Sequence, residues 1–266
     1  MAAPAGEARA VVFDLDETLV PLQTFARWQW AWRPNGPALS ERHVRAAIRR
    51  ELHAWDRRRW RGLVGAEPPT GPADYEAHLR RTLGAVADRP LPEAEVAAVV
   101  ERFLRPVGPF EPFPDVAPAL RAAADRQIPF VVLTALPDDV ARGLLRRSAI
   151  PEDRLVPSEG GLPPPPDKAA FRRAVGGLGI RPAQALYIGD LYWSDVRAAA
   201  RAGLRAVLLD RDDRIPPSTG ERIRSLRELG PLLDRPWTEG PGGPETGLER
   251  PIADAPGPGP GPSAEP

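Results

Sequence analysis

An apolar run near the start of the chain ends abruptly in two acids, in the sequence Val-Val-Phe-Asp-Leu-Asp-Glu-Thr-Leu at residues 11–19. Residues 10–16 predict a buried strand, because β-branched and aromatic residues are typical of such strands. Where this strand ends, the acids of Asp14 and Asp16 can converge at its carboxyl end, where open α/β sheets bind ligands. Two carboxylates at a buried edge repel each other unless a cation or a proton separates them. The pair therefore points to chemistry at this edge.

Two plainer structures also fit this motif taken alone, a solvated turn and a calcium-binding loop. A calcium loop needs Gly at its sixth position and Glu at its twelfth, and it follows a helix. Those positions hold Leu19 and Phe25 here, and a strand precedes them. The sequence therefore disfavours calcium, whereas a solvated turn stays open on this motif alone.

Strands and helices alternate through the second half of the chain. The expected strands are residues 130–133, 185–188 and 206–209, and the expected helices are residues 116–125, 138–148, 168–178, 195–202 and 221–229. Such alternation is typical of βαβ units. We therefore expect an α/β fold with a doubly wound parallel sheet.

The segment between the first strand and this alternating half has a different pattern. Apolar residues recur at helical spacing in residues 38–60, and residues 72–86 and 92–104 each have Pro near their first turn. The C-terminal residues, half of them Pro or Gly, predict a disordered tail. The expected domains are an α/β core (9–20 and 112–236), a helical domain (21–111) and the tail (237–266).

Composition narrows the class of protein. The 36 basic and 36 acidic residues give a net charge of zero, which argues against electrostatic binding to nucleic acid or to an anionic membrane. The longest apolar stretch, residues 128–136, is far too short to span a bilayer. The chain has no Cys, which rules out disulfides and thiol chemistry and fits a cytoplasmic protein.

Two further predicted strands also end in polar residues. Thr134 follows the apolar residues 131–133, and Asp190 follows residues 187–189. Because the carboxyl ends of parallel strands lie side by side, three separate segments bring two acids and a hydroxyl to one edge of the sheet. This convergence favours a site over a solvated turn.

These motifs resemble those of the haloacid dehalogenase (HAD) superfamily, chiefly its phosphatases with an α-helical cap between the first two motifs. The first motif is Asp-Leu-Asp-Glu-Thr at residues 14–18, and the second is Thr134 in Val-Val-Leu-Thr-Ala. The fourth motif is Gly-Asp-Leu-Tyr-Trp-Ser-Asp at residues 189–195. The resemblance covers residues 9–234. It implies a Rossmann-like core and a helical cap that closes over the site.

The resemblance implies a role in phosphoryl transfer for several of these residues. Asp14 would attack phosphorus and form an aspartyl-phosphate. Asp16 would protonate the leaving group and then deprotonate the water that hydrolyses the intermediate. Thr134 and Ala135 would bind the phosphoryl group, with the Thr134 hydroxyl donating a hydrogen bond.

The same resemblance implies a magnesium site. Mg²⁺ prefers oxygen ligands, and Asp14, the carbonyl of Asp16 and Asp190 would supply them. The metal would let the anionic Asp14 approach an anionic phosphate. Asp195 would lie behind these ligands and orient water or a basic partner.

The third motif of the superfamily is a lysine that pairs with the phosphate and the nucleophile. The chain has a single lysine, Lys168, which is therefore the candidate for this catalytic and phosphate-binding role. Close relatives place that lysine six residues before the apolar position held here by Phe171, and Pro165 occupies this slot. If Lys168 faces solvent, either Arg172 or Arg173 substitutes for it or catalysis is impaired.

Two features indicate which enzymes of the superfamily this chain resembles: the acid at Asp16 and the lack of a lysine in the helical segment. Dehalogenases lack an acid at the position of Asp16, because halide leaves without a proton, and phosphonatases need a cap lysine, which residues 21–111 lack. We therefore expect a magnesium-dependent phosphatase that acts on a small phosphorylated metabolite. A phosphomutase and a weakly catalytic binding or regulatory protein on the same scaffold are the alternatives. The chain could be a monomer or a homodimer.

The helical segment is rich in Trp, His and Arg. Five of the seven Trp residues and all three His residues lie in residues 21–111, and an Arg-Arg-Arg run at 57–59 is flanked by Trp55 and Trp60. This pattern predicts either an aromatic, basic lip for a ring-bearing or polyanionic substrate, or a Trp-rich core with a solvated basic face. We favour the second interpretation and expect the histidines on the surface.

Overall fold

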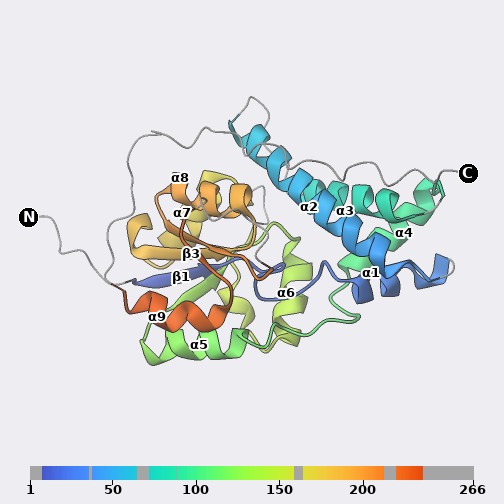
Figure 1. Ribbon diagram of the computed structural model, residues 1–266. Coiled ribbons are helices and arrows are strands. Elements are labelled where there is room, and N and C mark those ends of the chain that lie inside the picture. Colours follow the sequence, from blue (N-terminus) through green and yellow to red (C-terminus); the bar gives the residue numbers. More distant parts are fainter. Residues whose placement is uncertain are drawn as a thin grey trace, which may run out of the picture.

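A parallel sheet lies at the centre of the molecule. The computed structural model describes residues 8–35, 38–64, 72–87, 89–158, 164–212 and 220–235 (Figure 1). These residues form a five-stranded sheet in the order β2-β1-β3-β4-β5. Its strands are β1 (Ala10–Phe13), β2 (Phe130–Val132), β3 (Ala185–Gly189), β4 (Arg205–Leu209) and β5 (Arg222–Ile223). All pairings are parallel, which confirms the α/β prediction.

The register of the central strand explains which residues meet at the sheet edge. Phe13 pairs with Val132 of β2 and with Ile188 of β3. Asp14 follows Phe13 directly, whereas Thr134 and Asp190 follow their paired positions by two residues, so all three leave the sheet at nearly the same level. Consequently the first acid, the hydroxyl after β2 and the acid after β3 all emerge at one edge.

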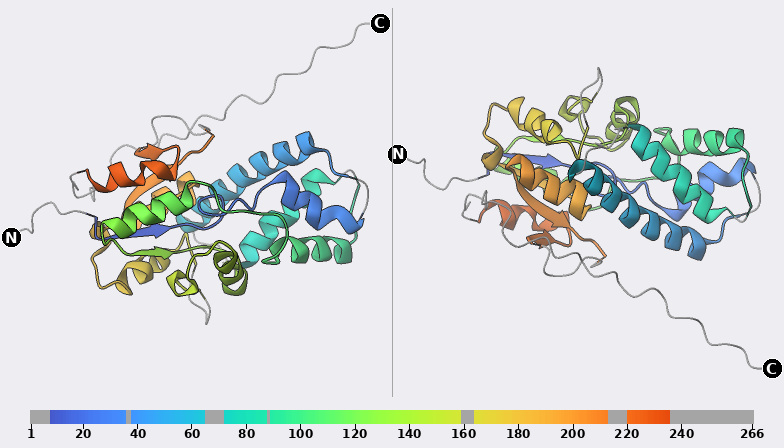
Figure 2. Two further views of the ribbon diagram at one scale, coloured as in Figure 1. Left: turned by 90° about the horizontal axis from the view of Figure 1, so that it is seen from below. Right: turned by 90° about the horizontal axis from the view of Figure 1, so that it is seen from above.

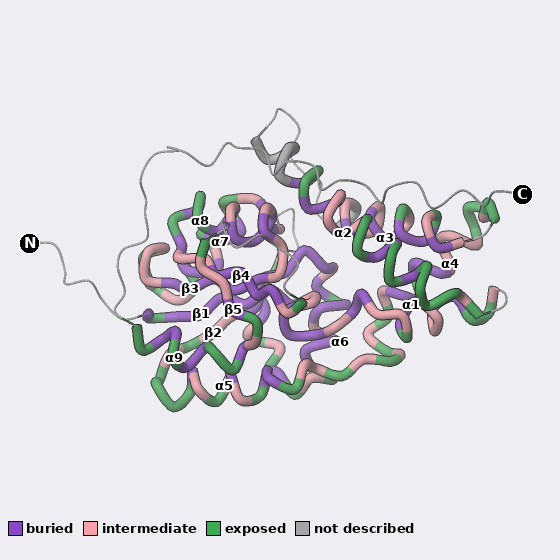
Figure 3. Tube along the Cα trace, in the orientation of Figure 1, coloured by how far each residue is buried: buried purple, intermediate pink, exposed green. Residues whose placement is uncertain are grey.

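Helices cover both faces of the sheet (Figures 1 and 2). Side chains alternate between the faces of a strand, so Val12 points to one face and Val11 and Phe13 point to the other. On the face of Val12 lie α7 (Lys168–Gly176) and α8 (Ala198–Ala202), and on the other lie α5 (Val116–Asp125), α6 (Asp138–Arg147) and α9 (Leu229–Leu233). The sheet is buried between these layers, whereas the outer faces of the helices are exposed (Figure 3).

The segment between β1 and α5 forms a helical insertion at the carboxyl ends of the strands (Figure 1). Its helices are α1 (Phe25–Trp32), α2 (Glu41–Val64), α3 (Pro72–Val86) and α4 (Glu93–Leu104). The completely buried Arg27 joins α1 to the end of α4, because its guanidinium donates hydrogen bonds to the carbonyls of Phe103 (3.0 Å) and Val107 (3.1 Å). Among the described helices, none is both long and apolar enough to span a membrane.

Two predicted helices differ from the structure. Residues 221–229 are not one helix, because Leu208 and Asp210 donate backbone hydrogen bonds to Glu221 and Ile223, which holds this segment in an extended strand, β5. The helix expected at 195–202 begins earlier, with a π-helical turn at Tyr192–Arg197 before α8. The predicted tail, residues 237–266, lies outside the described residues.

The prediction for the histidines is partly wrong. His43 is exposed, but His78 on α3 is completely buried. Its ring stacks on Trp55 of α2 with 4.8 Å between ring centroids and an interplanar angle of 17°. The stacked rings are part of the apolar contact between α2 and α3, and burial lowers the pKa of His78 to about 3.

Candidate active site

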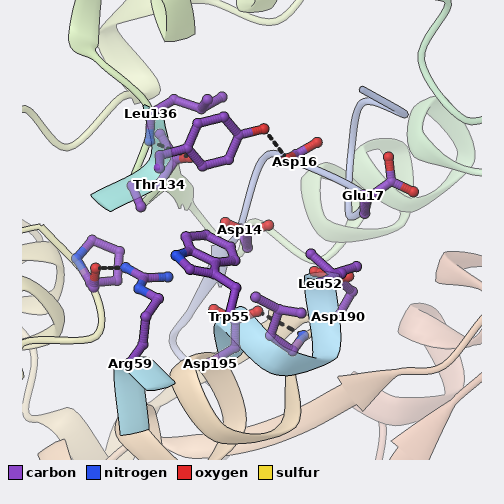
Figure 4. A pocket seen from close by; sticks show the side chains of 14 residues that line it. Asp14, Asp16, Glu17, Leu52, Trp55, Arg59, Thr134, Leu136, Asp190 and Asp195 are labelled. Atoms are coloured by element: carbon purple, nitrogen blue, oxygen red, sulfur yellow. Dashed lines mark hydrogen bonds between the residues drawn. The ribbon is translucent and has the colours of Figure 1, made fainter. Parts of the chain in front are cut away.

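A small cavity lies where the helical insertion covers the carboxyl edge of the sheet (Figure 4). Its volume is about 30 Å³. The sheet edge and the insertion both contribute to its lining, which consists of Asp14, Asp16, Glu17, Leu52, Trp55, Arg59, Tyr75, Thr134, Ala135, Leu136, Pro165, Asp190, Leu191 and Asp195.

Asp14 is the first residue after β1, and only 8% of its surface is exposed. Its backbone amide donates to the carbonyl of Ile188 (2.9 Å), which continues the pairing of β1 with β3 by one residue. Burial raises the pKa of Asp14 well above its usual range, and the neighbouring charges of Asp195 and Asp16 raise it further. The carboxylate is therefore held at a position where a cation would stabilise it.

Asp16 points away from the acids of the sheet edge and toward the insertion. Its Oδ2 accepts a hydrogen bond of 2.5 Å from the hydroxyl of Tyr75 on α3, and that hydroxyl accepts one of 3.1 Å from Nε2 of Gln23. Oδ1 of Asp16 is buried without a hydrogen-bond partner. Burial raises the pKa of Asp16 to about 6, although the bonds from Tyr75 and Gln23 oppose the rise. The turn that follows contains Glu17 in a left-handed conformation (φ 57°).

Three carboxylates gather at the end of β3. Oxygens of Asp14, Asp190 and Asp195 all lie within 4.8 Å of one another. Burial raises the pKa of Asp190 well above its usual range, and the charges of Asp195 and Asp14 add to the rise. Burial also raises the pKa of Asp195 to about 7. Such a cluster of repelling oxygens is what a hard divalent cation would stabilise.

Asp195 is held more firmly than its two neighbours. Its Oδ2 accepts from the backbone amide of Leu191 (2.9 Å), and its Oδ1 accepts from the hydroxyl of Tyr187 (3.1 Å). Its carboxylate also packs directly on Gly189, where the Cβ of any larger residue would lie 2.6 Å from Cγ of Asp195. Glycine at this position therefore allows the close approach of the carboxylate to the strand.

Thr134 and Ala135 follow β2 and line the same cavity. Thr134 is 4% exposed, and its Oγ1 accepts a hydrogen bond from the amide of Leu136 (3.3 Å). The structure thus brings together all the predicted site residues from the first, second and fourth motifs. Their chemical roles stay predictions.

The predicted third-motif residue does not join them. Lys168 is the first residue of α7, is exposed, and is not among the described residues that line the cavity. Arg172 is also exposed, and Arg173, one residue further along α7, does not line the cavity either. The reason is geometric: α7 begins with Lys168 on its outer side, whereas Pro165, three residues earlier, faces the cavity.

A different cation lines the cavity, Arg59 of α2, which is 3% exposed. One of its terminal nitrogens donates a hydrogen bond to the carbonyl of Pro165. Its guanidinium carbon lies 4.4 Å from the ring centroid of Trp55, and its Nε lies 3.2 Å from Oδ2 of Asp74. Arg57 and Arg58 are exposed, so the prediction of a solvated basic face is correct for these two residues and wrong for Arg59.

Helix α2 is also attached to the core by Asp56, which is 4% exposed. Oδ1 of Asp56 accepts from the amide (2.7 Å) and the hydroxyl (2.5 Å) of Ser194, and Oδ2 accepts from the amide of Trp193 (3.1 Å). Trp193 and Ser194, which supply these donors, lie in the first turn of the helix that follows Asp190. The insertion is therefore bonded to the same segment that carries two of the cavity acids.

Three residues of the insertion that contribute to the site were not among the predicted site residues: Arg59, Tyr75 and Asp56. The Trp- and Arg-rich pattern of residues 55–60 did mark the right part of α2, but it did not distinguish Arg59 from its neighbours. Tyr75 and Asp56 carry no sequence signal of their own, because their importance depends on how the helices dock.

Comparison with known proteins agrees with this geometry. The family model described as "haloacid dehalogenase-like hydrolase" matches residues 8–203. A glyceraldehyde 3-phosphate phosphatase of Methanopyrus kandleri is 28% identical over 235 residues, which cover 83% of this chain and 96% of the relative. A phosphoserine phosphatase of Thermus thermophilus is 30% identical over 183 residues, which cover 66% of this chain and 71% of the relative.

Solved structures share the fold at lower identity. The L-2-haloacid dehalogenase of Xanthobacter autotrophicus matches with a TM-score of 0.62 and 19% identity, covering 85% of this chain and 98% of that one. The HAD-hydrolase YfnB of Bacillus subtilis, bound to magnesium, matches with a TM-score of 0.65 and 17% identity, covering 86% of this chain and 100% of that one. The family match spans most of the chain, from β1 through α8, and the protein is a member of the haloacid dehalogenase-like hydrolases.

Proposed function

We propose that this hydrolase is a magnesium-dependent phosphatase that releases phosphate from a small phosphorylated metabolite through an aspartyl-phosphate on Asp14. The observation that carries the proposal is the pairing of two acids in different surroundings. Asp14 lies among carboxylates, whereas Asp16 turns toward Tyr75 and has a pKa of about 6. The names of the two relatives, both phosphatases, support this reaction class.

The two acids divide the work of phosphoryl transfer. An oxygen of Asp14 forms a bond to phosphorus while the bond from phosphorus to the leaving oxygen breaks. Asp16 gives its proton to that leaving oxygen, which departs as an alcohol. Asp16, now a carboxylate, then accepts a proton from the water that attacks the aspartyl-phosphate, and inorganic phosphate is released. An acid with a pKa near neutrality can both give and regain a proton under ordinary conditions.

The donor set fits magnesium. The oxygens of Asp14, Asp190 and Asp195 lie close together. Burial raises the pKa of Asp14 and Asp190, and the charge of Asp195 raises both further, an effect that a hard cation would offset. In the proposal Asp14, Asp190 and the carbonyl of Asp16 hold the ion. Asp195, already bonded to Leu191 and Tyr187, keeps its orientation beside them. When bound, the ion neutralises negative charge on the nucleophile and the phosphate.

The proposal includes a cycle of opening and closing, because the cavity is lined by both the insertion and the sheet edge. A metabolite enters only when α1–α4 separate from the sheet edge, and their return excludes water from the reacting atoms. The insertion would then act as a cap domain (residues 21–111) on a core of residues 9–20 and 112–236. We place the enzyme in the cytoplasm because the sequence has no Cys.

The test is phosphate release from a panel of phosphorylated metabolites and from p-nitrophenyl phosphate, with Mg²⁺ present. We expect wild type to release phosphate and Asp14→Asn to lose at least about 10⁴-fold in kcat, as expected for removal of a nucleophile. Asp125→Asn, on the exposed face of α5, is the matched control and should behave like wild type. Isomerisation of a sugar phosphate without release would indicate a mutase, and no release from any substrate would contradict catalysis.

A further inference from the structure

Arg59 is a buried cation on the cavity wall, held by one hydrogen bond to a backbone carbonyl and by an ion pair with Asp74. We infer that Arg59, on helix α2 of the insertion, binds the transferring phosphoryl group and provides the positive charge that Lys168 does not bring to the site. The inference rests on the proposed phosphatase function and adds a phosphate-binding residue to it. It also means that the site is complete only when the insertion lies against the sheet.

The first argument is the charge balance of the cavity. Its described lining contains five acidic residues, Asp14, Asp16, Glu17, Asp190 and Asp195, and Arg59 is the one basic residue among them. A phosphate dianion that approaches Asp14 needs positive charge beyond that of one divalent ion, because several of these acids carry negative charge as well. Within the described lining, that charge can come from Arg59.

The second argument is the state of the guanidinium itself. It has five N–H donors, and the bond to the carbonyl of Pro165 uses one of them. Nε forms an ion pair with Oδ2 of Asp74 (3.2 Å) but makes no hydrogen bond. Burial lowers the pKa of Arg59, and the charges of Asp74, Asp195, Asp56 and Asp14 oppose that effect. The group remains a cation with unused donors beside the cavity, and a planar guanidinium suits a phosphate.

Contrast with the other buried arginine supports this interpretation. Arg27 is completely buried too, but its guanidinium donates to three carbonyls at the end of α4, those of Phe103, Arg105 and Val107. It does not line the cavity. Arg27 therefore has a structural role, whereas Arg59 combines one backbone bond with a place on the cavity wall.

The third argument is position. Arg59 bonds to the carbonyl of Pro165, and Pro165 also lines the cavity. Residue 165 is the slot in which the family resemblance predicts a lysine, three positions before the exposed Lys168. A side chain from α2 thus reaches the place where a cation from the core is missing. Figure 4 shows Arg59 and Trp55 beside Asp14 and Asp195, with α2 supplying the first two.

The experiment measures the binding of inorganic phosphate to the full-length protein by calorimetry, with Mg²⁺ present, and kcat/KM for p-nitrophenyl phosphate alongside it. We expect Arg59→Gln to lower kcat/KM by about 10²–10³-fold, the usual cost of removing one donor to a developing charge. We also expect it to weaken phosphate binding at least tenfold. Arg58→Gln removes the same charge from the neighbouring exposed residue and should match wild type.

Arg59→Met is the second variant. Its side chain keeps the apolar contact of the arginine stem with Trp55, so this variant should fold even if Arg59→Gln does not. Thermal unfolding of each variant establishes that it is folded. Phosphate binding within threefold of wild type in either folded variant would overturn the inference, as would a wild-type protein that does not bind phosphate. If wild type binds phosphate and hydrolyses nothing, the proposed function fails while the Arg59 comparison still decides the inference.

Discussion

The sheet edge and helix α2 both place buried aspartates where they meet. The acids of the sheet edge face one another, whereas the aspartate of α2 faces hydrogen-bond donors. At the sheet edge, Asp14, Asp190 and Asp195 lie together. Burial raises the pKa of Asp14 and Asp190, and the charge of Asp195 raises both further. On α2, Asp56 accepts three hydrogen bonds from Trp193 and Ser194, which oppose the effect of its burial. The first arrangement is one that a bound cation would stabilise, and the second holds the insertion on the core.

The largest effect is expected at the sheet edge, with Asp190→Asn. Activity should fall by about 10³-fold, because a metal ion contributes several kcal/mol to charge stabilisation. In the absence of divalent ions the variant should nevertheless melt at a higher temperature than wild type, since one repelling charge is gone. Thermal unfolding in EDTA and in MgCl₂ checks this, with Asp125→Asn as control. If Asp190→Asn melted at a lower temperature than wild type in EDTA, the acids of the sheet edge would not differ from Asp56 in their effect on stability.

The next effect is expected on α2, with Asp56→Asn. An amide group would face three donors that now bond to a carboxylate, so the free energy of unfolding should fall by about 1–3 kcal/mol. Urea unfolding of this variant beside Asp125→Asn measures the loss. An unchanged or higher stability would mean that Asp56 resembles the acids of the sheet edge after all.

The third effect depends on pH and concerns a buried base rather than a buried acid. The pKa of His78 is lowered to about 3 by burial, and the positive charges of Arg58 and Arg59 on α2 and of Arg81 on α3 add to this. Protonation therefore favours the unfolded chain. The stability that neutral His78 provides is complete above pH 6.5 and is lost as the pH falls toward 3, at up to about 1.4 kcal/mol per pH unit.

Urea unfolding between pH 4 and 8 tests this for His78→Leu. The variant should lose less stability than wild type as the pH falls, because it has no imidazole to protonate. His43→Leu, at an exposed position, should keep the slope of wild type. Parallel slopes in all three proteins would show that His78 binds protons equally in the folded and unfolded states, which would contradict its lowered pKa.

The sheet edge was predictable from sequence, because strand periodicity and parallel pairing are local and general rules. Asp14, Thr134 and Asp190 each follow an apolar run, and the register of β1 with its neighbours places them at one edge. The exact ends of helices and the extended strand at residues 222–223 were less predictable, since pairing with β4 overrides the local helical pattern.

The contribution of the insertion was not predictable for a physical reason. Arg57, Arg58 and Arg59 look alike in sequence, and only the docking of α2 on the core buries the third of them. Tyr75, which bonds to Asp16, lies 59 positions further along the chain, on a helix that carries no recognisable motif. Lys168 stood out because it is the single lysine, but the start of α7 turns it outward.

A crystal structure of the protein with Mg²⁺ and orthovanadate would test most directly whether the two regions form one site. We predict vanadium in line with an oxygen of Asp14, with the hydroxyl of Thr134 and the guanidinium of Arg59 donating to the vanadate oxygens. Vanadate bound away from Asp14, or held by Lys168 with Arg59 turned from it, would contradict the joint site.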